Sequence, residues 1–181
     1  MLSRLLFGAF LLTAAASAST PAVGEQAPEF ELKSLGGASV SLSSERSQGP
    51  VVLIVLRGFP GYQCPVCSRQ VREFVTAAET FKGARARVVM IYPGPGDKLA
   101  DRAAQSEAGK ALPNGFTLLL DPDYQFTNLY GLRWDAPKET AYPSTFVMDR
   151  SGKIVFAKIS KTHGGRAGVD EVVAILRNLR E

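Results

Sequence analysis

The feature that most constrains the fold is an apolar run, residues 51–56, followed by Cys64-Pro65-Val66-Cys67. The run shows no polar alternation and is bounded by Gly49-Pro50 and Gly58, which is typical of a strand buried on both faces of a sheet. After the cysteines, apolar residues recur at helical spacing over residues 66–78. We therefore expect a buried strand, a turn and a helix, with the chain's only two cysteines at the helix start.

The rest of the chain alternates strand and helix patterns. A hairpin is predicted from residues 30–33 and 39–42, and one helical turn from Ser43 to Arg46. The further predicted elements are a buried strand at 87–92, a helix capped by Asp97 and reaching Ala108, a strand at 117–120, a helix from Asp121 through Tyr130 closed by Gly131, a hairpin of 145–148 and 153–159, and a helix at 168–179. This order predicts one α/β domain, a mixed sheet with helices on both faces and an N-terminal hairpin extension.

The N-terminal residues, 1–18, have the pattern of a signal peptide. Arg4 supplies a positive charge, Leu5 to Ala16 is apolar, and Ala16-Ser17-Ala18 is a small-x-small cleavage site. We expect the domain to comprise residues 19–181 and the protein to be exported, to the periplasm or outside the cell, with no membrane span once the signal is removed. A retained N-terminal membrane anchor is the alternative.

The composition is that of a globular protein, with 45% hydrophobic and 21% charged residues. The formal net charge is +4, but Lys and Arg are scattered and form no block. This distribution is typical of a solvated surface, and it argues against a nucleic-acid partner.

The placement of the two cysteines predicts thiol chemistry. Cys64 would be the N-cap of the helix and Pro65 its first residue, where a missing N–H costs little. Unpaired N–H groups at a helix start lower the pKa of a cysteine in a Cys-x-x-C motif. Cys67 lies one turn further on, within reach to resolve a mixed disulfide. We expect Cys64 to be the exposed nucleophile and Cys67 the more buried resolving thiol.

Two other readings of the cysteines remain open. A zinc site needs about four ligands, and the chain offers two cysteines and a single histidine, His163. An inert disulfide is the other alternative. Neither redox chemistry nor an inert disulfide requires a metal or a bound cofactor, so none is predicted.

Several residues are predicted to shape the site. Pro60, Tyr62 and Pro65 flank the cysteines, and Arg57 follows the buried strand, where it either lowers the thiolate pKa or points to solvent. Pro143 begins a later strand, and its bond to Tyr142 is either cis, beside the cysteines, or trans. His163 is a further candidate, either as a proton donor near the site or as an ordinary surface histidine. Trp134 either forms part of a substrate-binding surface or simply packs against its neighbours.

Three motifs together resemble the thioredoxin-like superfamily, specifically the redoxin group of alkyl hydroperoxide reductase and thiol-specific antioxidant (AhpC/TSA) proteins. They are the strand 51–56 with Cys64-Pro65-Val66-Cys67, the pair Tyr130-Gly131, and the segment from Tyr142 to Ile154. The resemblance covers the predicted mature chain. It implies a thioredoxin-like fold in which Pro143 is cis and packs against the disulfide.

The resemblance supports two activities, and the chain departs from both patterns. Peroxiredoxins carry Pro-x-x-x-Thr/Ser-x-x-Cys, and here Pro60 and Cys67 match while Cys64 takes the Thr position. They also use an arginine near the hairpin strand, for which Arg57 or Arg133 is a candidate substitute. Thioredoxins have Trp before the first cysteine, where this chain has Gln63, and a buried Asp where it has Arg57-Gly58.

Three functional hypotheses follow from these residues. The first is an exported thiol–disulfide oxidoreductase, with Cys64 as nucleophile and Cys67 as resolving thiol. The second is a peroxiredoxin-like antioxidant enzyme that reduces hydroperoxides. The third is a binding module that keeps the fold and holds partners at its Pro143 face. The expected partners are protein or small-molecule thiols and disulfides, hydroperoxides under the second hypothesis, and a redox partner protein.

Overall fold

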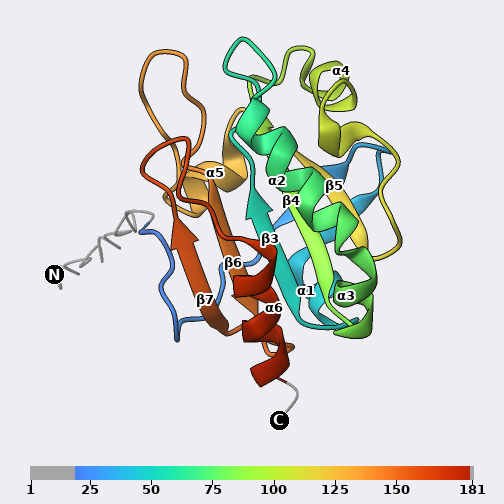
Figure 1. Ribbon diagram of the computed structural model, residues 1–181. Coiled ribbons are helices and arrows are strands. Elements are labelled where there is room, and N and C mark those ends of the chain that lie inside the picture. Colours follow the sequence, from blue (N-terminus) through green and yellow to red (C-terminus); the bar gives the residue numbers. More distant parts are fainter. Residues whose placement is uncertain (1–18, 180–181) are drawn as a thin grey trace, which may run out of the picture.

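The computed structural model describes residues 19–179, and the predicted signal peptide lies outside the described residues. Its centre is a seven-stranded mixed sheet in the order β2-β1-β5-β4-β3-β6-β7 (Figure 1). The strands are β1 (Glu31–Ser34), β2 (Ser39–Ser41), β3 (Val51–Val55), β4 (Arg87–Gly94), β5 (Phe116–Pro122), β6 (Ser144–Met148) and β7 (Ile154–Ile159). The pairs β3–β4 and β4–β5 are parallel and the remaining pairs are antiparallel.

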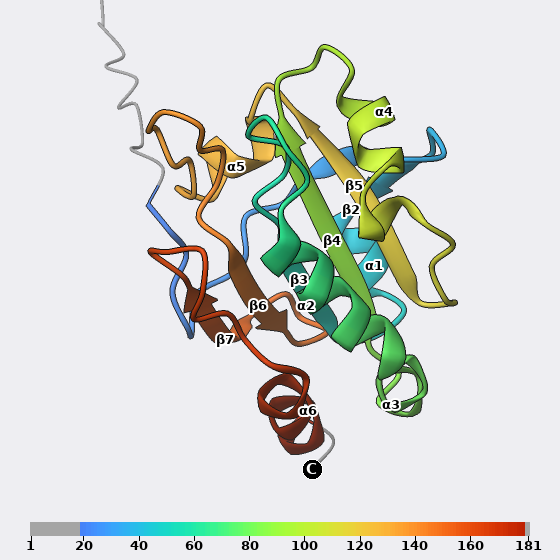
Figure 2. The ribbon, with the colours of Figure 1, turned by 45° about the horizontal axis from the view of Figure 1, so that its top comes forward.

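Helices cover both faces of this sheet. They are α1 (Leu42–Arg46), α2 (Pro65–Thr76), α3 (Ala78–Gly83), α4 (Leu99–Ala104), the 3₁₀ turn η1 (Glu107–Gly109), α5 (Gln125–Leu129) and α6 (Val169–Asn178). One core lies under α2, α3, α4 and α6, and a second lies under α1 and α5. Figure 2 shows α2 and α6 on the same face of the sheet. The predicted mixed α/β sheet with an N-terminal hairpin is confirmed.

Strand β3 is central and every one of its residues is buried. Side chains that alternate along it enter opposite cores, Val52 and Ile54 on the α2 side and Val51 and Leu53 on the other. A continuous apolar run is what such a strand requires, because neither face meets water. The prediction for residues 51–56 is therefore confirmed to within one residue.

Three predicted helices differ in the structure. The helix predicted from Asp121 through Tyr130 spans only Gln125–Leu129, because Asp121 and Pro122 belong to strand β5 and the Asp121 carboxylate accepts the N–H groups of Phe126 and Thr127. The helix after the cysteines begins at Pro65 and breaks at Ala77, and the break brings Phe81 of α3 to stack on Phe74 of α2 at 5.4 Å between ring centroids. The predicted helix from Asp97 to Ala108 is wrong in its bounds. Lys98, not Asp97, is the N-cap of α4, and the helix ends before Ser106, whose hydroxyl donates to the carbonyl of Ala103.

The turn after β3 depends on Gly58. Its φ is +70°, and a Cβ built there would lie 1.8 Å from the carbonyl oxygen of Pro93 on β4. Both the positive φ and the close approach exclude a larger residue. The glycine therefore lets the chain leave β3 and return to the start of α2, which places the cysteines at the carboxyl end of β3.

Candidate active site

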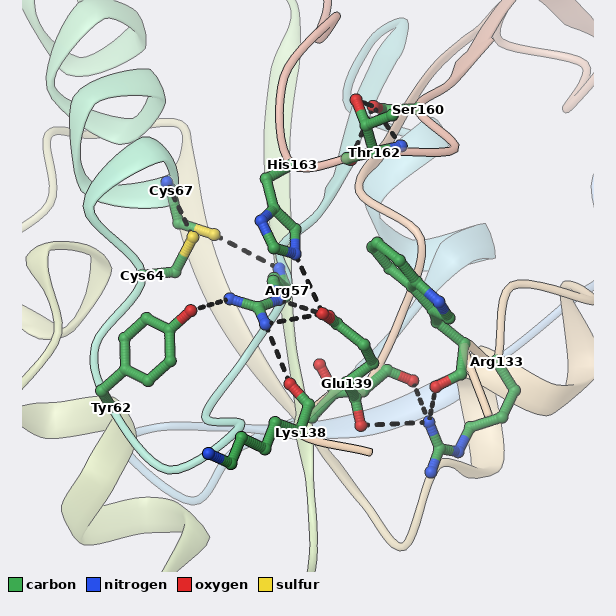
Figure 3. Close-up of polar contacts among 12 residues, drawn as sticks. Arg57, Tyr62, Cys64, Cys67, Arg133, Lys138, Glu139, Ser160, Thr162 and His163 are labelled. Carbon is green, nitrogen blue, oxygen red and sulfur yellow. Dashed lines mark hydrogen bonds and ion pairs between the residues drawn. The ribbon is translucent and has the colours of Figure 1, made fainter. Parts of the chain in front are cut away.

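Cys64 is the N-cap residue of α2, with an extended backbone conformation. Its Sγ accepts the backbone N–H of Cys67 at 3.4 Å, and Pro65 occupies the first helical position and is exposed. Both cysteines are free thiols in this structure. Cys67 lies one turn along the helix, and Figure 3 shows the two sulfurs side by side.

Cys67 is surrounded by donors from distant parts of the chain. Its Sγ accepts the backbone N–H of Arg57 at 3.3 Å and Nη1 of Arg166 at 3.3 Å. The other terminal nitrogen of Arg166 lies 3.8 Å from Cys64 Sγ. One guanidinium therefore faces both sulfurs, and it comes from the segment between β7 and α6.

These contacts separate the pKa values of the two thiols. The pKa of Cys64 is lowered to about 5, first by the hydrogen bond from the Cys67 thiol, then by the Cys67 backbone N–H and the charges of Arg166 and Arg57, against the opposing effect of burial. The pKa of Cys67 is raised well above its usual range, because its proton is held by Cys64 and its sulfur is buried. The pair therefore carries a single thiolate at neutral pH, on Cys64.

Neither sulfur is open to solvent, so the expectation of an exposed Cys64 is wrong. Cys64 is 4% exposed and Cys67 is 7% exposed, so by exposed fraction Cys67 is not the more buried of the two residues, contrary to the expectation. On one side they line a small hollow together with Gln63, Tyr92 and Ala108. This hollow exists because η1 packs against α2, which the linear pattern of the sequence did not indicate. Arg166 contacts the sulfurs as well.

Arg57 forms a buried polar cluster beside the cysteines (Figure 3). Its guanidinium donates to both carboxylate oxygens of Glu139, at 2.6 and 2.9 Å, to the hydroxyl of Tyr62 at 2.7 Å and to the carbonyl of Lys138. Arg57 is 2% exposed, so its side chain does not point to solvent. Its side chain thereby connects the loop before α2 with the segment before β6, and its backbone N–H donates to Cys67 Sγ.

His163 and Trp134 extend this cluster. His163 Nε2 lies 2.9 Å from Glu139 Oε1, and the indole ring of Trp134 packs between the rings of Tyr142 and His163 at 4.9 and 5.4 Å between centroids. The carbonyl of His163 accepts Nε of Arg166 at 3.0 Å. The cluster thus positions the backbone of the same short segment that carries Arg166 to the sulfurs.

We expect loss of Glu139 to destabilise the protein strongly. Burial opposes ionisation of this carboxyl, but hydrogen bonds from Arg57 and His163 hold its pKa below the usual range. Glu139→Ala leaves the buried Arg57 without its counter-ion, which typically costs about 3–5 kcal/mol. Denaturant unfolding of the reduced protein measures this loss.

The matched control is Asp135→Ala, because the Asp135 carboxylate is 95% exposed and pairs with Arg133 at 3.7 Å. It should change the unfolding free energy by less than about 1 kcal/mol. Equal effects of the two variants would contradict a structural role for the Arg57–Glu139 pair.

The remaining predicted site residues are placed as follows. Pro60 is half-buried in the irregular segment before α2, and the ring of Tyr62 is 47% exposed. Pro143 is buried at the carboxyl end of β3, since Ser144 pairs with Val55. The predicted cis bond is wrong, because the Tyr142–Pro143 peptide is trans. The Pro143 carbonyl accepts the N–H of Ser160, the residue after β7, at 2.8 Å. This hydrogen bond continues the pairing of β6 with β7, so the carbonyl is not directed at the cysteines.

Arg133 does not reach the sulfurs. Its guanidinium donates to the carbonyls of Trp134 and Thr140 and lies over the ring of Tyr124. Arg57 and Arg133 were the arginines considered as partners of the thiols, but the guanidinium that contacts the sulfurs is that of Arg166. The sequence analysis did not identify Arg166. The one sequence feature that could have pointed to Arg166 is its place at the end of the glycine-rich run Thr162-His163-Gly164-Gly165-Arg166.

Between residues 19 and 179, no cluster of three or more His, Cys, Asp or Glu side chains is arranged to hold a metal ion. Of the helices in that range, none combines the length and the apolar character needed to cross a bilayer.

Comparison with known proteins identifies close similarity to one family. The model of the AhpC/TSA family matches residues 23–157. A putative peroxiredoxin of Mycobacterium tuberculosis is 32% identical over 141 residues, covering 75% of this chain and 83% of the relative. A chloroplastic peroxiredoxin Q of Oryza sativa subsp. japonica is 32% identical over 133 residues, covering 74% of this chain and 57% of the relative.

Solved structures agree with the sequence comparison. The crystal structure of peroxidoxin BcpB from Mycobacterium tuberculosis superimposes with a TM-score of 0.69 at 26% identity, covering 88% of this chain and 98% of that one. The AhpC of the same organism has a TM-score of 0.70 at 19% identity, covering 89% and 94% of the two chains, and so supports the fold alone. The sheet described above is therefore a thioredoxin-like fold of the peroxiredoxin type.

Proposed function

This chain belongs to the AhpC/TSA family, and its similar relatives are named peroxiredoxins. From the geometry of its two cysteines we propose that it is an exported thiol–disulfide oxidoreductase. The observation that supports this proposal best is that one cysteine of the pair is stabilised as a thiolate while the other keeps its proton. Cys64, with its pKa lowered to about 5, is the nucleophile, and Cys67 is the resolving residue.

In the first step, the Cys64 thiolate attacks one sulfur of a substrate disulfide. A bond forms between Cys64 Sγ and that sulfur, the substrate S–S bond breaks, and the other half leaves as a thiolate. In doing so Cys64 loses its negative charge, so the hydrogen bond that it accepted from the Cys67 thiol weakens. The proton of Cys67 is then free to pass to the departing thiolate.

In the second step, the Cys67 thiolate attacks Cys64 Sγ. The intramolecular disulfide forms and the second half of the substrate leaves as a thiolate, which takes a proton from water, so two electrons pass from the protein to the substrate. The N–H of Arg57 and the guanidinium of Arg166 stabilise the charge on Cys67 during this step, since both already contact its sulfur. A dithiol redox partner returns the pair to the reduced form, and the same steps in reverse oxidise a dithiol.

A second candidate function is the reduction of hydroperoxides at the same pair. It is favoured by the names of the similar relatives, and by the position of Cys67, which matches the final cysteine of the peroxiredoxin pattern. A cysteine thiolate would attack the peroxide oxygen and become a sulfenic acid, releasing an alcohol or water. The other cysteine would then form the disulfide and release water. Against it, Cys64 replaces the hydroxyl residue of that pattern.

Side-by-side assays decide between the two activities. The reduced protein is mixed with 2-hydroxyethyl disulfide and, separately, with cumene hydroperoxide, and the loss of the protein's own thiols is followed by alkylation and mass spectrometry, because exchange with a disulfide leaves the total number of thiols unchanged. We expect fast oxidation by the disulfide with release of two equivalents of mercaptoethanol, and slower oxidation by the peroxide. Fast reaction with peroxide and none with disulfide would reverse the proposal.

Export is part of the proposal and is supported by the pattern of residues 1–18. An exported location would put the cysteine pair among other disulfide-forming proteins and away from the cytosolic thiol pool. The expected partners are accordingly thiols and disulfides of proteins or small molecules in that compartment, together with an exported or membrane-held reductant.

A further inference from the structure

A groove of ≈ 350 Å³ runs beside the redox pair, between α2 and the segment that precedes α6. One face of α2 lines it with residues spaced by three or four, namely Val66, Arg69, Gln70 and Glu73. The opposite wall is the short run from Gly164 to Gly168. A Cβ built on Gly164 or on Gly168 would meet no atom within 4 Å, so this wall leaves open space above its backbone.

The floor of the groove contacts the sulfurs through one side chain. Arg166 lines the groove, donates from Nη1 to Gln70 Oε1 at 3.1 Å, and contacts Cys67 from the same nitrogen. Gln70 is 4% exposed and also donates to the Ala167 carbonyl, so the floor is fixed from both sides. The groove therefore adjoins the reactive pair, and the Arg166 side chain belongs to both.

The groove is positively charged. Arg166 and Arg69 line it against one carboxylate, that of Glu73. The Arg69 side chain is 67% exposed, and its contact with Glu73 is long, at 4.0 Å, so its guanidinium is available to a ligand. An arginine fork binds a carboxylate with two parallel hydrogen bonds, which favours this group over a neutral one.

We propose that this groove binds the carboxylate of a low-molecular-weight disulfide, with Arg69 as its principal contact. The inference rests on the proposed function and names a substrate class for it. An anionic disulfide is repelled by the Cys64 thiolate, and the two guanidiniums offset that repulsion and hold the substrate beside the pair. The volume is at the lower end of the range for small-molecule sites, which fits a compact dicarboxylate rather than a folded protein surface.

The test compares three small disulfides that differ in charge. They are 3,3′-dithiodipropionate, which is anionic, 2-hydroxyethyl disulfide, which is neutral, and cystamine, which is cationic. The rate constant of the reduced protein with each is divided by that of free dithiothreitol, which removes intrinsic reactivity. We expect the normalised rate to be highest for the anionic disulfide and lowest for the cationic one.

The variant Arg69→Gln should lower the ratio of the anionic to the neutral rate by about three- to tenfold. Arg72→Gln removes the same charge from the same helix, but Arg72 donates to Glu107 of η1 and does not line the groove, so this control should keep the wild-type ratio. A wild-type ratio near one, or equal effects of the two variants, would overturn the inference.

The neutral disulfide separates this inference from the proposed function. If 2-hydroxyethyl disulfide is reduced but no preference for charge appears, the groove proposal is wrong and the oxidoreductase proposal stands. If none of the three disulfides is reduced while hydroperoxide is consumed, the proposed function fails first.

Discussion

Replacing Cys64 by serine is expected to abolish disulfide reduction, whereas replacing Cys67 is expected to stop the reaction halfway. A serine hydroxyl does not ionise at neutral pH, so Cys64→Ser has no nucleophile for the first step. Cys67→Ser keeps a thiolate at the start of α2, supported by the backbone N–H of residue 67 and by Arg166. It should therefore form a mixed disulfide that persists, because no thiol remains to resolve it.

Mass spectrometry of the intact protein measures both outcomes after incubation with 2-hydroxyethyl disulfide. Cys67→Ser should gain one mercaptoethanol adduct and Cys64→Ser none. Ser68→Ala, which alters the next residue of α2 and leaves both thiols, is the control and should turn over normally. An adduct on Cys64→Ser and none on Cys67→Ser would mean that the two roles are reversed. Retention of fast peroxide reduction by Cys64→Ser would instead favour the peroxidase hypothesis, with Cys67 as the reacting thiol.

Replacing Arg166 is expected to raise the pKa of Cys64 and shift the pH dependence of the reaction. The guanidinium lies 3.8 Å from Cys64 Sγ and contributes to lowering that pKa to about 5. Arg166→Met removes this charge while the hydrogen bond from Cys67, which is the largest cause, remains, so the pKa of Cys64 should rise by roughly one unit above about 5. At a pH below about 5, where the thiolate fraction follows the pKa, the first step should therefore slow by about tenfold.

The pH dependence of the Arg166→Met effect provides an internal control. Above the pKa of a free thiol Cys64 is ionised in both proteins, so the difference in rate should disappear there. The ultraviolet absorbance of the thiolate, followed against pH in Cys67→Ser and in the corresponding double variant, measures the pKa directly. Arg166→Lys should restore part of the shift, because it returns the charge without the fork. An unchanged titration in Arg166→Met would exclude an electrostatic role for this residue.

Much of the fold could be predicted from the sequence because its signals are local. The apolar run of β3 and the apolar stripe of α2 each predict which of their own residues are buried, and Gly58 predicts the turn between them. The hairpin of β6 and β7 was predicted in the same way, from Asp149 and Gly152 at its turn. These elements alone bring Cys64, Cys67 and Pro143 to one end of the sheet.

The surroundings of the thiols were not predictable in this way, because they depend on contacts between distant residues. Arg166 is 99 residues from Cys67 in the chain and Glu139 is 82 from Arg57, and no period or turn signal links such pairs. The burial of Cys64 depends likewise on η1. Nor does any local signal in the sequence distinguish a trans from a cis bond before Pro143, which is trans in the structure.

The position of Trp134 has a consequence for following this protein in solution. It is the chain's single tryptophan, and its ring is packed between Tyr142 and His163. His163 belongs to the segment whose Arg166 rests on the sulfurs, so any displacement of that segment on oxidation alters the surroundings of the indole. The native chain thus contains an intrinsic fluorophore whose emission would change, without a label, if oxidation of the thiols moved that segment.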